Sequence, residues 1–160
     1  MFGNNLRFIH KNLKVSKEKL CEILPGNSWL LLINPEREFF PIINLLKKFG
    51  LTEKNIGQVL VRDANVLNPK RNNLFELKEK LKYLTLRLNL NLEIKENGIF
   101  PEILGKSYSG WIQPRGEIMV KTGNVKMLEE IYGLKEEEFI KVMGVSKNMM
   151  QAQLNRTGTK

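Results

Sequence analysis

The residues of this sequence with the clearest chemical potential are cations. The chain has 26 lysines and arginines against 17 aspartates and glutamates, a formal net charge of +9. Cationic side chains bind phosphate oxygens, and nucleic acid is the commonest partner of so basic a chain, followed by anionic membranes and acidic proteins. The cations that lie off the apolar positions described below are the candidate phosphate-binding residues: Lys47, Lys48, Arg62, Lys70, Arg71, Lys82, Arg87 and Arg115.

Residues that carry enzymatic or metal chemistry are scarce. The chain has one cysteine, Cys21, and one histidine, His10. It contains no Gly-x-x-x-x-Gly-Lys phosphate loop, no Gly-x-Ser-x-Gly nucleophile turn and no paired His/acid helix motif. We therefore predict a non-catalytic protein without a metal or a cofactor. We expect Cys21 to be a small buried residue.

The composition is that of one soluble domain. Apolar residues make up 42% of the chain and charged residues 27%, close to the averages of globular proteins, which excludes a fully disordered chain. The longest apolar run, Trp29–Ile33, is far shorter than the roughly 20 residues of a membrane-spanning helix. We expect an intracellular, soluble, monomeric protein with no membrane partner.

The elements that position the cations follow from an apolar repeat. Val15, Leu51, Leu90 and Leu134 hold equivalent positions, 36, 39 and 44 residues apart. Each is preceded by apolar residues nine, six and two positions earlier. Three of the four are followed by apolar residues five, eight and nine positions later, whereas the copy around Leu90 breaks down at Lys95. Both sets of spacings place the apolar residues on one face of a helix.

Turn and cap residues separate the two helices of each copy. Gly50 and Asn89 suit a left-handed helix end, and Ser16, Thr52 and Asn91 suit the N-cap of the helix that follows. Each copy is therefore a helix, a tight turn, a second helix and a short segment that ends in an apolar pair. Since neither helix buries its apolar face alone, the copies must stack.

Stacking of this kind defines the predicted fold class. We expect an all-α protein, a right-handed α-solenoid of about four helical repeats. The predicted single domain spans 5–153, with copies at about 5–35, 40–70, 78–106 and 112–152, and a flexible basic tail at 154–160.

Three motifs resemble one family. The short segment of the third copy reads Phe100-Pro-Glu-Ile-Leu104, the next copy opens with Ile112-Gln-Pro-Arg115, and the second copy contains Gly50-Leu-Thr-Glu-Lys-Asn-Ile56. In the order in which they follow one another along the chain, these motifs resemble the mitochondrial transcription termination factor (mTERF) family, over roughly residues 5–150. The usual proline of the short segment is present only in the third copy, and members of the family usually carry about twice as many repeats.

The resemblance implies a curved array of three-helix repeats whose basic face binds double-stranded DNA or structured RNA in a mitochondrion or plastid. The corresponding function is non-catalytic nucleic-acid binding through the phosphate backbone, in organellar or bacterial-type gene expression. Two alternatives remain. An unrelated helical repeat would serve as a protein-interaction scaffold, for example within a ribonucleoprotein. Residues 134–156 also resemble a helix-turn-helix DNA-binding regulator, with Gly144 in the turn and Asn148 and Gln151 on the second helix.

Overall fold

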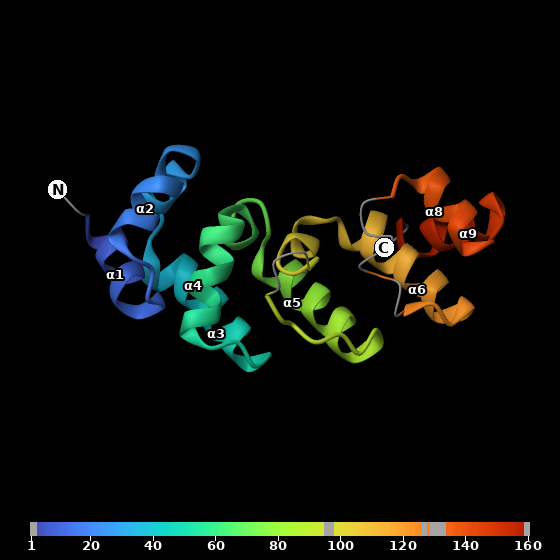
Figure 1. Cartoon of the computed structure of the whole chain (residues 1–160), viewed down its shortest axis with the longest axis horizontal. Helices are drawn as coiled ribbons and strands as arrows, with labels where there is room; N and C mark the ends of the chain where they lie inside the picture. The colour runs from blue at the N-terminus through green and yellow to red at the C-terminus, as the bar shows by residue number, and fades with distance from the viewer. Residues whose placement is uncertain (1–2, 95–97, 126–127, 129–133, 159–160) are drawn as a thin grey trace.

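The protein is a row of stacked helices. The computed structural model describes residues 3–94, 98–125, 128 and 134–158. Residues 156–158 are described by their backbone alone. The helices follow one another in chain order along the long axis of the molecule, from α1 at one end to α8 and α9 at the other (Figure 1). Helices and loops account for all of the described residues, without a strand. The predicted all-α solenoid is confirmed.

The first two copies have the predicted order of elements. The first copy consists of α1 (Asn4–Leu13), α2 (Lys17–Ile23) and the 3₁₀ turns η1 (Leu24–Gly26) and η2 (Ser28–Leu31). The second copy consists of the π turn η3 (Pro35–Phe39), α3 (Phe40–Lys48), α4 (Glu53–Arg62) and the 3₁₀ turn η4 (Ala64–Leu67). Each pair of helices is thus followed by a short helical turn, which corresponds to the predicted third segment.

Two of the turns use the left-handed residue that the sequence indicates, Gly50 or Asn89, and the turn after α1 uses Lys14. Lys14, Gly50 and Asn89 have positive φ angles of 58°, 93° and 53°, the left-handed conformation that ends a helix. The Ser16 hydroxyl accepts a hydrogen bond of 3.2 Å from the Lys19 backbone N–H. Thr52 forms a reciprocal capping box at the start of α4, with its side chain and its backbone N–H both hydrogen bonded to the third residue of the helix.

The third copy departs from the predicted pattern. Its elements are α5 (Leu74–Lys82), the π turn η5 (Tyr83–Arg87) and the 3₁₀ turn η6 (Glu102–Gly105). The prediction that Asn91 caps a second helix is wrong, because residues 91–94 are not helical. Leu90, Leu92 and Ile94 are half-buried and alternate with exposed Asn91 and Glu93. This period of two is typical of an extended chain with one buried side.

The described part of the fourth copy includes a helix, α6, that its apolar repeat does not predict. Its elements are the π turn η7 (Tyr108–Ile112), α6 (Gln113–Thr122), α8 (Glu136–Met143) and α9 (Lys147–Gly158). Helix α6 packs against α9 and against η7. The predicted turn at Gly133, and Tyr132 before it, lie outside the described residues. The segment 154–160, expected to be a flexible tail, is helical as far as Gly158.

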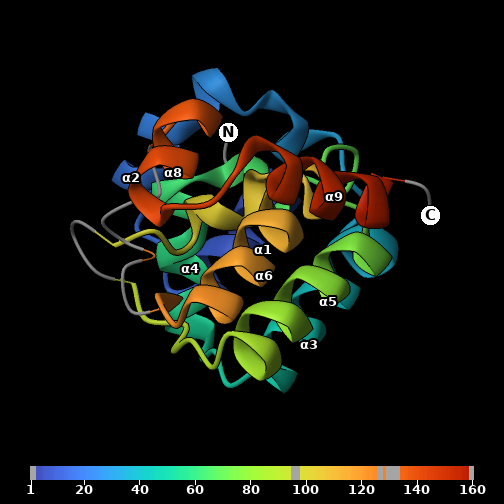
Figure 2. The same cartoon turned by 90° about the vertical axis from the view of Figure 1, so that its right-hand side faces the viewer.

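One continuous apolar core runs through all four copies. The residues of the predicted apolar faces that are almost completely buried include Ile9, Leu60, Leu81 and Phe139. Seen along the long axis, α3 and α5 lie on one side of the molecule, and α2 and α8 lie on the other (Figure 2). The two sides of the solenoid therefore expose different helices, and grooves between successive copies lie on both.

Buried polar side chains hold the third copy together and tie it to the second, where the Asn72 amide donates to the Val66 carbonyl of η4 at 3.2 Å. Lys80 is only 3% exposed, and its Nζ donates to the Leu104 carbonyl at 2.8 Å and to Asn72 Oδ1 at 3.2 Å. The Asn72 amide donates to the same carbonyl at 3.0 Å. A buried ammonium must be paired or hydrogen bonded, so this contact fixes η6 against α5. Burial lowers the pKa of Lys80, and the nearby Glu76 carboxylate opposes that shift.

A second polar cluster joins the third copy to the fourth. The Tyr83 hydroxyl donates to Glu117 Oε2 at 2.6 Å, and Arg87 Nε and Nη2 each donate to the same carboxylate at 3.0 Å. The hydrogen bond from Arg87 lowers the pKa of Glu117, and burial raises the pKa of Tyr83. Gly116 lies directly beneath the tyrosine, where an added Cβ would lie 2.5 Å from the hydroxyl.

Candidate nucleic-acid interface

The eight predicted cations differ in how far they reach solvent. Arg62 is half-buried and Arg115 is buried, with 6% of its surface exposed. The exposed members are Lys47, Lys48, Lys70, Arg71, Lys82 and Arg87. Because a phosphate oxygen must reach the cation that binds it, the exposed residues are the ones that can form an interface.

Two of the predicted lysines come together between the second and third copies. A hollow of about 580 Å³ lies between α3 and α5, and Lys48 of α3 and Lys82 of α5 line it together with Lys78. All three lysines are exposed. The remaining lining is mainly apolar: Pro41, Leu45, Phe49 and Leu74. We call this hollow the α3–α5 groove.

Lys78 is a member of the groove that is not among the eight predicted cations. It lies four residues before Lys82, and this spacing places two side chains on the same face of a helix. The spacing is visible in the sequence. The sequence does not show which helix lies opposite this face, and so does not reveal that Lys78 and Lys82 face Lys48 of α3.

The lysines of the groove are weakly held within the folded chain. Lys82 Nζ lies 3.9 Å from Glu79 Oε1, and 47% of the lysine side chain is exposed. An exposed pair of this kind is worth about 0–1 kcal/mol, so a phosphate can replace the carboxylate. Within the described ranges, no ion pair involves Lys48 or Lys78.

Lys47, Lys70 and Arg71 are exposed but do not line the groove. Lys47 faces the turn into α4, where its Nζ lies 3.8 Å from Glu53 Oε1. Lys70 and Arg71 lie in the loop between η4 and α5, and Asn68 accepts hydrogen bonds from both of their backbone N–H groups. The loop leads directly into the helix that contributes Lys78 and Lys82.

Three predicted arginines are occupied by contacts within the solenoid. Arg62 donates to Glu102 Oε1 and to the Gly98 carbonyl, both at 2.6 Å, and so joins the second copy to the third. Arg87 forms the two-pronged pair with Glu117 described above. A paired guanidinium can reach a phosphate only by giving up its carboxylate. The structure therefore makes Arg62 and Arg87 joining residues of the repeats.

Arg115 corrects the prediction most clearly. Its Nη1 donates to the Leu134 carbonyl at 2.6 Å, and its guanidinium lies 4.6 Å from the Trp111 ring centroid and 5.0 Å from that of Phe139. Cation–π contacts and a carbonyl hydrogen bond compensate the buried charge. Arg115 thus fixes the fourth copy and is not exposed at the surface.

A second basic hollow lies between the first and second copies, and we call it the α2–α4 hollow. It measures about 330 Å³, and Lys14, Lys19, Lys54 and Arg62 line it. Lys14 Nζ donates to the Lys11 carbonyl, and Lys19 pairs with Glu22 at 3.2 Å. The Lys19–Glu22 pair is more exposed than the Lys82–Glu79 pair, so a phosphate can replace it too, whereas Arg62 is held by the half-buried Glu102. The α2–α4 hollow is therefore a second, smaller candidate surface beside the α3–α5 groove.

The C-terminal helices have part of the geometry of a helix-turn-helix. Gly144 ends α8 with a φ angle of 67°, and the Ser146 hydroxyl accepts a hydrogen bond of 3.1 Å from the Met149 N–H. Asn148 and Gln151 are exposed on α9. Gln153, another polar residue of the supposed recognition helix, is 3% exposed. Helix α9 packs against α6 and against η7.

Other kinds of site find little support among the described residues. That part of the chain contains no cluster of three histidine, cysteine or acidic side chains able to hold a metal. None of its helices is long and apolar enough to cross a membrane. Cys21, expected to be buried, is exposed on α2, because the apolar face of that short helix is centred on Leu20.

The fold and its surface define a class of protein. This is a helical-repeat protein in which three exposed lysines line a groove between two successive copies. The sequence model of the mTERF family matches residues 2–140, and the chain belongs to that family. The family consists of nucleic-acid-binding helical-repeat proteins of organellar gene expression that are generally non-catalytic. Comparisons with curated proteins and with solved structures gave no match.

Proposed function

We propose that this protein binds double-stranded DNA or duplex regions of RNA non-catalytically, with the phosphate backbone held in the α3–α5 groove. The observation that carries the proposal is the placement of Lys48, Lys78 and Lys82 in one hollow contributed by two consecutive copies. Lysines arranged in this way neutralise neighbouring phosphates without reading the bases.

The apolar lining supports the same assignment. Leu45, Phe49 and Leu74 form a low-dielectric surface around the lysines, and a charge beside such a surface is screened less than one in open solvent. The attraction between ammonium and phosphate is correspondingly stronger there. Lys70 and Arg71, in the loop before α5, extend the proposed interface beyond the groove.

A salt titration with a matched variant tests the proposal. We would measure the affinity for one DNA duplex and one RNA duplex, using wild type and the triple variant Lys48→Gln, Lys78→Gln, Lys82→Gln. On DNA, each phosphate that is no longer neutralised should lower the slope of log K against log salt by about 0.9. The slope of the triple variant should therefore be smaller by between two and three if all three lysines touch phosphates.

The control neutralises three exposed lysines elsewhere: Lys11, Lys135 and Lys141. It has the same net charge as the groove variant, so a general effect of charge would weaken both equally. Equal affinities and equal slopes for the two variants would contradict the groove assignment. No binding of wild type to either duplex at low salt would contradict nucleic-acid binding itself.

The cellular setting follows from the family. We infer that the protein acts in a mitochondrion or a plastid, on the transcripts or the DNA of that organelle. Detection of the endogenous protein in purified organelles, treated with protease before and after lysis, tests this inference.

A further inference from the structure

On the side away from the α3–α5 groove, α5 borders a second hollow, which is lined by carboxylates where the groove is lined by lysines. It measures about 510 Å³ and lies between α5 and the segment that contains η7 and the start of α6. Two aromatic rings, Phe75 and Tyr108, and two carboxylates, Glu76 and Glu79, form most of its lining, and Gln113 borders it. Among the described residues, no lysine or arginine lines it. We call it the acidic–aromatic pocket.

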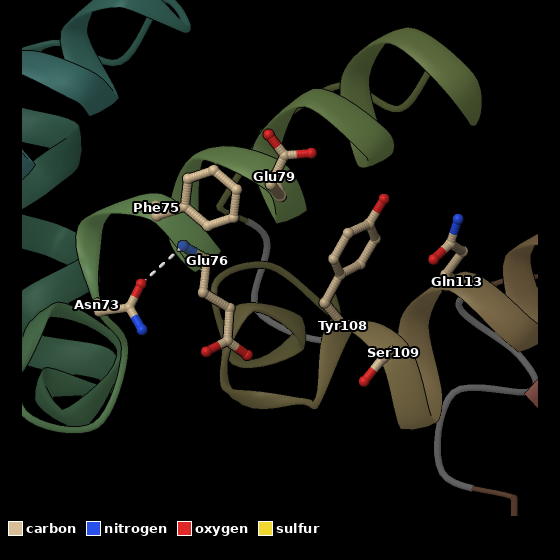
Figure 3. A pocket seen from close by; sticks show the side chains of 7 residues that line it. All are labelled: Asn73, Phe75, Glu76, Glu79, Tyr108, Ser109 and Gln113. Carbon is tan, nitrogen blue, oxygen red and sulfur yellow. Dashed lines mark hydrogen bonds between the residues drawn. The ribbon is translucent and has the colours of Figure 1, made fainter. Parts of the chain in front are cut away.

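The two rings stand on opposite walls of this pocket. Phe75 and Glu79 project from α5, whereas Tyr108 and Gln113 project from the facing segment (Figure 3). Phe75 is 75% exposed, an unusual position for a large apolar side chain. Tyr108 rests against Tyr83, with ring centroids 5.8 Å apart, and is held in place by that contact. The exposed Phe75 ring and the half-buried Tyr108 ring thus border the pocket beside the carboxylates.

The carboxylates of the pocket are only partly engaged. Glu76 Oε1 lies 3.5 Å from Lys80 Nζ, and Glu79 Oε1 lies 3.9 Å from Lys82 Nζ. Each of these pairs uses one oxygen of its carboxylate. Burial and the charge of Glu79 raise the pKa of Tyr108, so its hydroxyl remains a neutral hydrogen-bond donor at physiological pH.

We propose that the acidic–aromatic pocket binds an arginine side chain of a protein partner. A guanidinium is planar, so it can stack on the rings of Phe75 and Tyr108 while it donates hydrogen bonds to Glu79. The carboxylates repel phosphate, so the pocket disfavours the nucleic-acid backbone. A lysine ammonium matches the charge but cannot stack, and it should bind more weakly.

The proposal extends the function of the protein beyond nucleic-acid binding. Helix α5 presents Lys78 and Lys82 toward α3 and presents Phe75 and Glu79 toward η7. One helix therefore separates a surface that suits phosphates from a surface that suits cations. A partner protein in the pocket would lie one helix away from bound nucleic acid, in contact with the same repeat.

The test uses blocked tripeptides and the whole chain. We would titrate Gly-Arg-Gly, Gly-Lys-Gly and Gly-citrulline-Gly into isotopically labelled protein and follow the backbone amide signals of Phe75, Glu79 and Ser109. Citrulline has the shape of arginine without its charge. The arginine peptide should shift these signals saturably, the lysine peptide should bind at least threefold more weakly, and the citrulline peptide should cause no saturable shift.

Variants locate the binding. Phe75→Ala and Glu79→Gln should each weaken binding of the arginine peptide at least fivefold. Leu86→Ala is the matched control, because Leu86 is 76% exposed just beyond α5 and does not line the pocket. That control should bind the peptide as wild type does. Phe75→Ala should also retain duplex binding, so a failure of this proposal can be told apart from a failure of the nucleic-acid proposal.

Three outcomes would overturn the assignment. Equal binding of the citrulline and arginine peptides would show that charge is not recognised. Displacement of the arginine peptide by a mononucleotide would assign the rings to base stacking. Self-association that Phe75→Ala abolishes, seen by sedimentation at the same concentration, would show that the occupant is a second copy of this chain.

Discussion

Gly57 determines how closely the first two repeats approach each other. It lies in α4 directly over the end of α1, and an added Cβ would lie 2.1 Å from the Leu13 carbonyl oxygen. Backbone atoms cannot yield as a flexible side chain can, so the two helices would have to separate. We expect Gly57→Ala to lower the free energy of unfolding by about 1–3 kcal/mol, measured by urea denaturation.

The control for this change is another exchange of glycine for alanine. Gly26 is exposed and has no atom within 4 Å of an added Cβ. Gly26→Ala should therefore change stability by no more than about 0.5 kcal/mol. Similar losses in the two variants would show that helix contact is not the reason for glycine at position 57.

Glu117 makes the junction between the third and fourth copies sensitive to acid. Hydrogen bonds from Arg87 and Tyr83 lower the pKa of its carboxyl group in the folded chain. The stabilisation is therefore present above the pKa of the unfolded state, about 4.3, and is lost as the pH falls through the lower folded value. We expect Glu117→Gln to be less stable than wild type at pH 7, and the difference in urea midpoint to shrink toward pH 3.

Glu53→Gln is the reference for this measurement, since it removes an acid from an ion pair in which both side chains are nearly half exposed. It should differ little from wild type at pH 7. If the gap between Glu117→Gln and wild type stays constant down to pH 3, the carboxylate cluster is not the cause of the instability.

Burial also explains which single cations the sequence could not assign. Arg62 and Arg115 stand at helix ends or between copies, as a ligand to phosphate would. Their actual partners, Glu102 and the Leu134 carbonyl, are 40 and 19 residues away along the chain. A contact over that separation depends on how the copies stack. No local pattern distinguishes such an arginine from an exposed one.

At the level of elements, the apolar repeat predicts the helices well where it is regular. It places the turn at Gly50 and the caps at Ser16 and Thr52 because these signals are local. It fails in the third copy, where the alternation of Leu90, Leu92 and Ile94 indicates an extended chain. A repeat register carried over from neighbouring copies is a weaker guide there than this local period of two.

Helix α6 shows a different limit. Residues 113–122 form a helix. This helix precedes the apolar residues, nine, six and two positions before Leu134, from which the fourth copy is identified. This helix contains Pro114 near its start and ends at Gly123, which adopts the left-handed conformation with a φ angle of 73°. Both signals are present in the sequence. A spacing of 44 residues, interpreted as a single repeat, includes this helix in the fourth copy without predicting it.

Stacking of repeats predicts how stability is distributed among them. Leu60 is fully buried in the second copy, which has a neighbour on each side, whereas Leu6 is 5% exposed in the first copy. Leu60→Ala should lower the free energy of unfolding by about 2–5 kcal/mol. Leu6→Ala should cost less, because a terminal repeat can open without the rest. Equal losses in urea denaturation would contradict a linear array and favour a closed bundle.

Across the whole molecule, the hollows between successive repeats differ in the sign of the charge that lines them. The α3–α5 groove is lined by three lysines and the α2–α4 hollow by four cations, whereas the acidic–aromatic pocket is lined by two carboxylates. Composition predicts the net charge of +9 but not this separation, which arises because each groove is lined by residues from two copies. The nucleic-acid proposal therefore depends on particular grooves, and variants of equal net charge can test it.

The loop before α5 decides between the solenoid and the helix-turn-helix as the nucleic-acid surface. The double variant Lys70→Gln, Arg71→Gln should leave the free energy of unfolding within about 0.5 kcal/mol of wild type, because both side chains are exposed. If both touch phosphates, it should weaken binding equally on two unrelated duplexes and lower the salt slope by about two.

A recognition helix at α9 predicts the opposite pattern. Asn148→Ala or Gln151→Ala would then reduce the preference between the two duplexes by about 1–3 kcal/mol for each base that is no longer read, and the loop variant would bind as wild type does. Burial of Gln153 leaves fewer side chains on α9 to read bases, so we expect the loop variant to have the larger effect. Affinities on both duplexes, measured for both sets of variants at one salt concentration, separate the two surfaces. Unchanged binding in both sets would remove each of these surfaces from the interface and favour a protein-interaction scaffold.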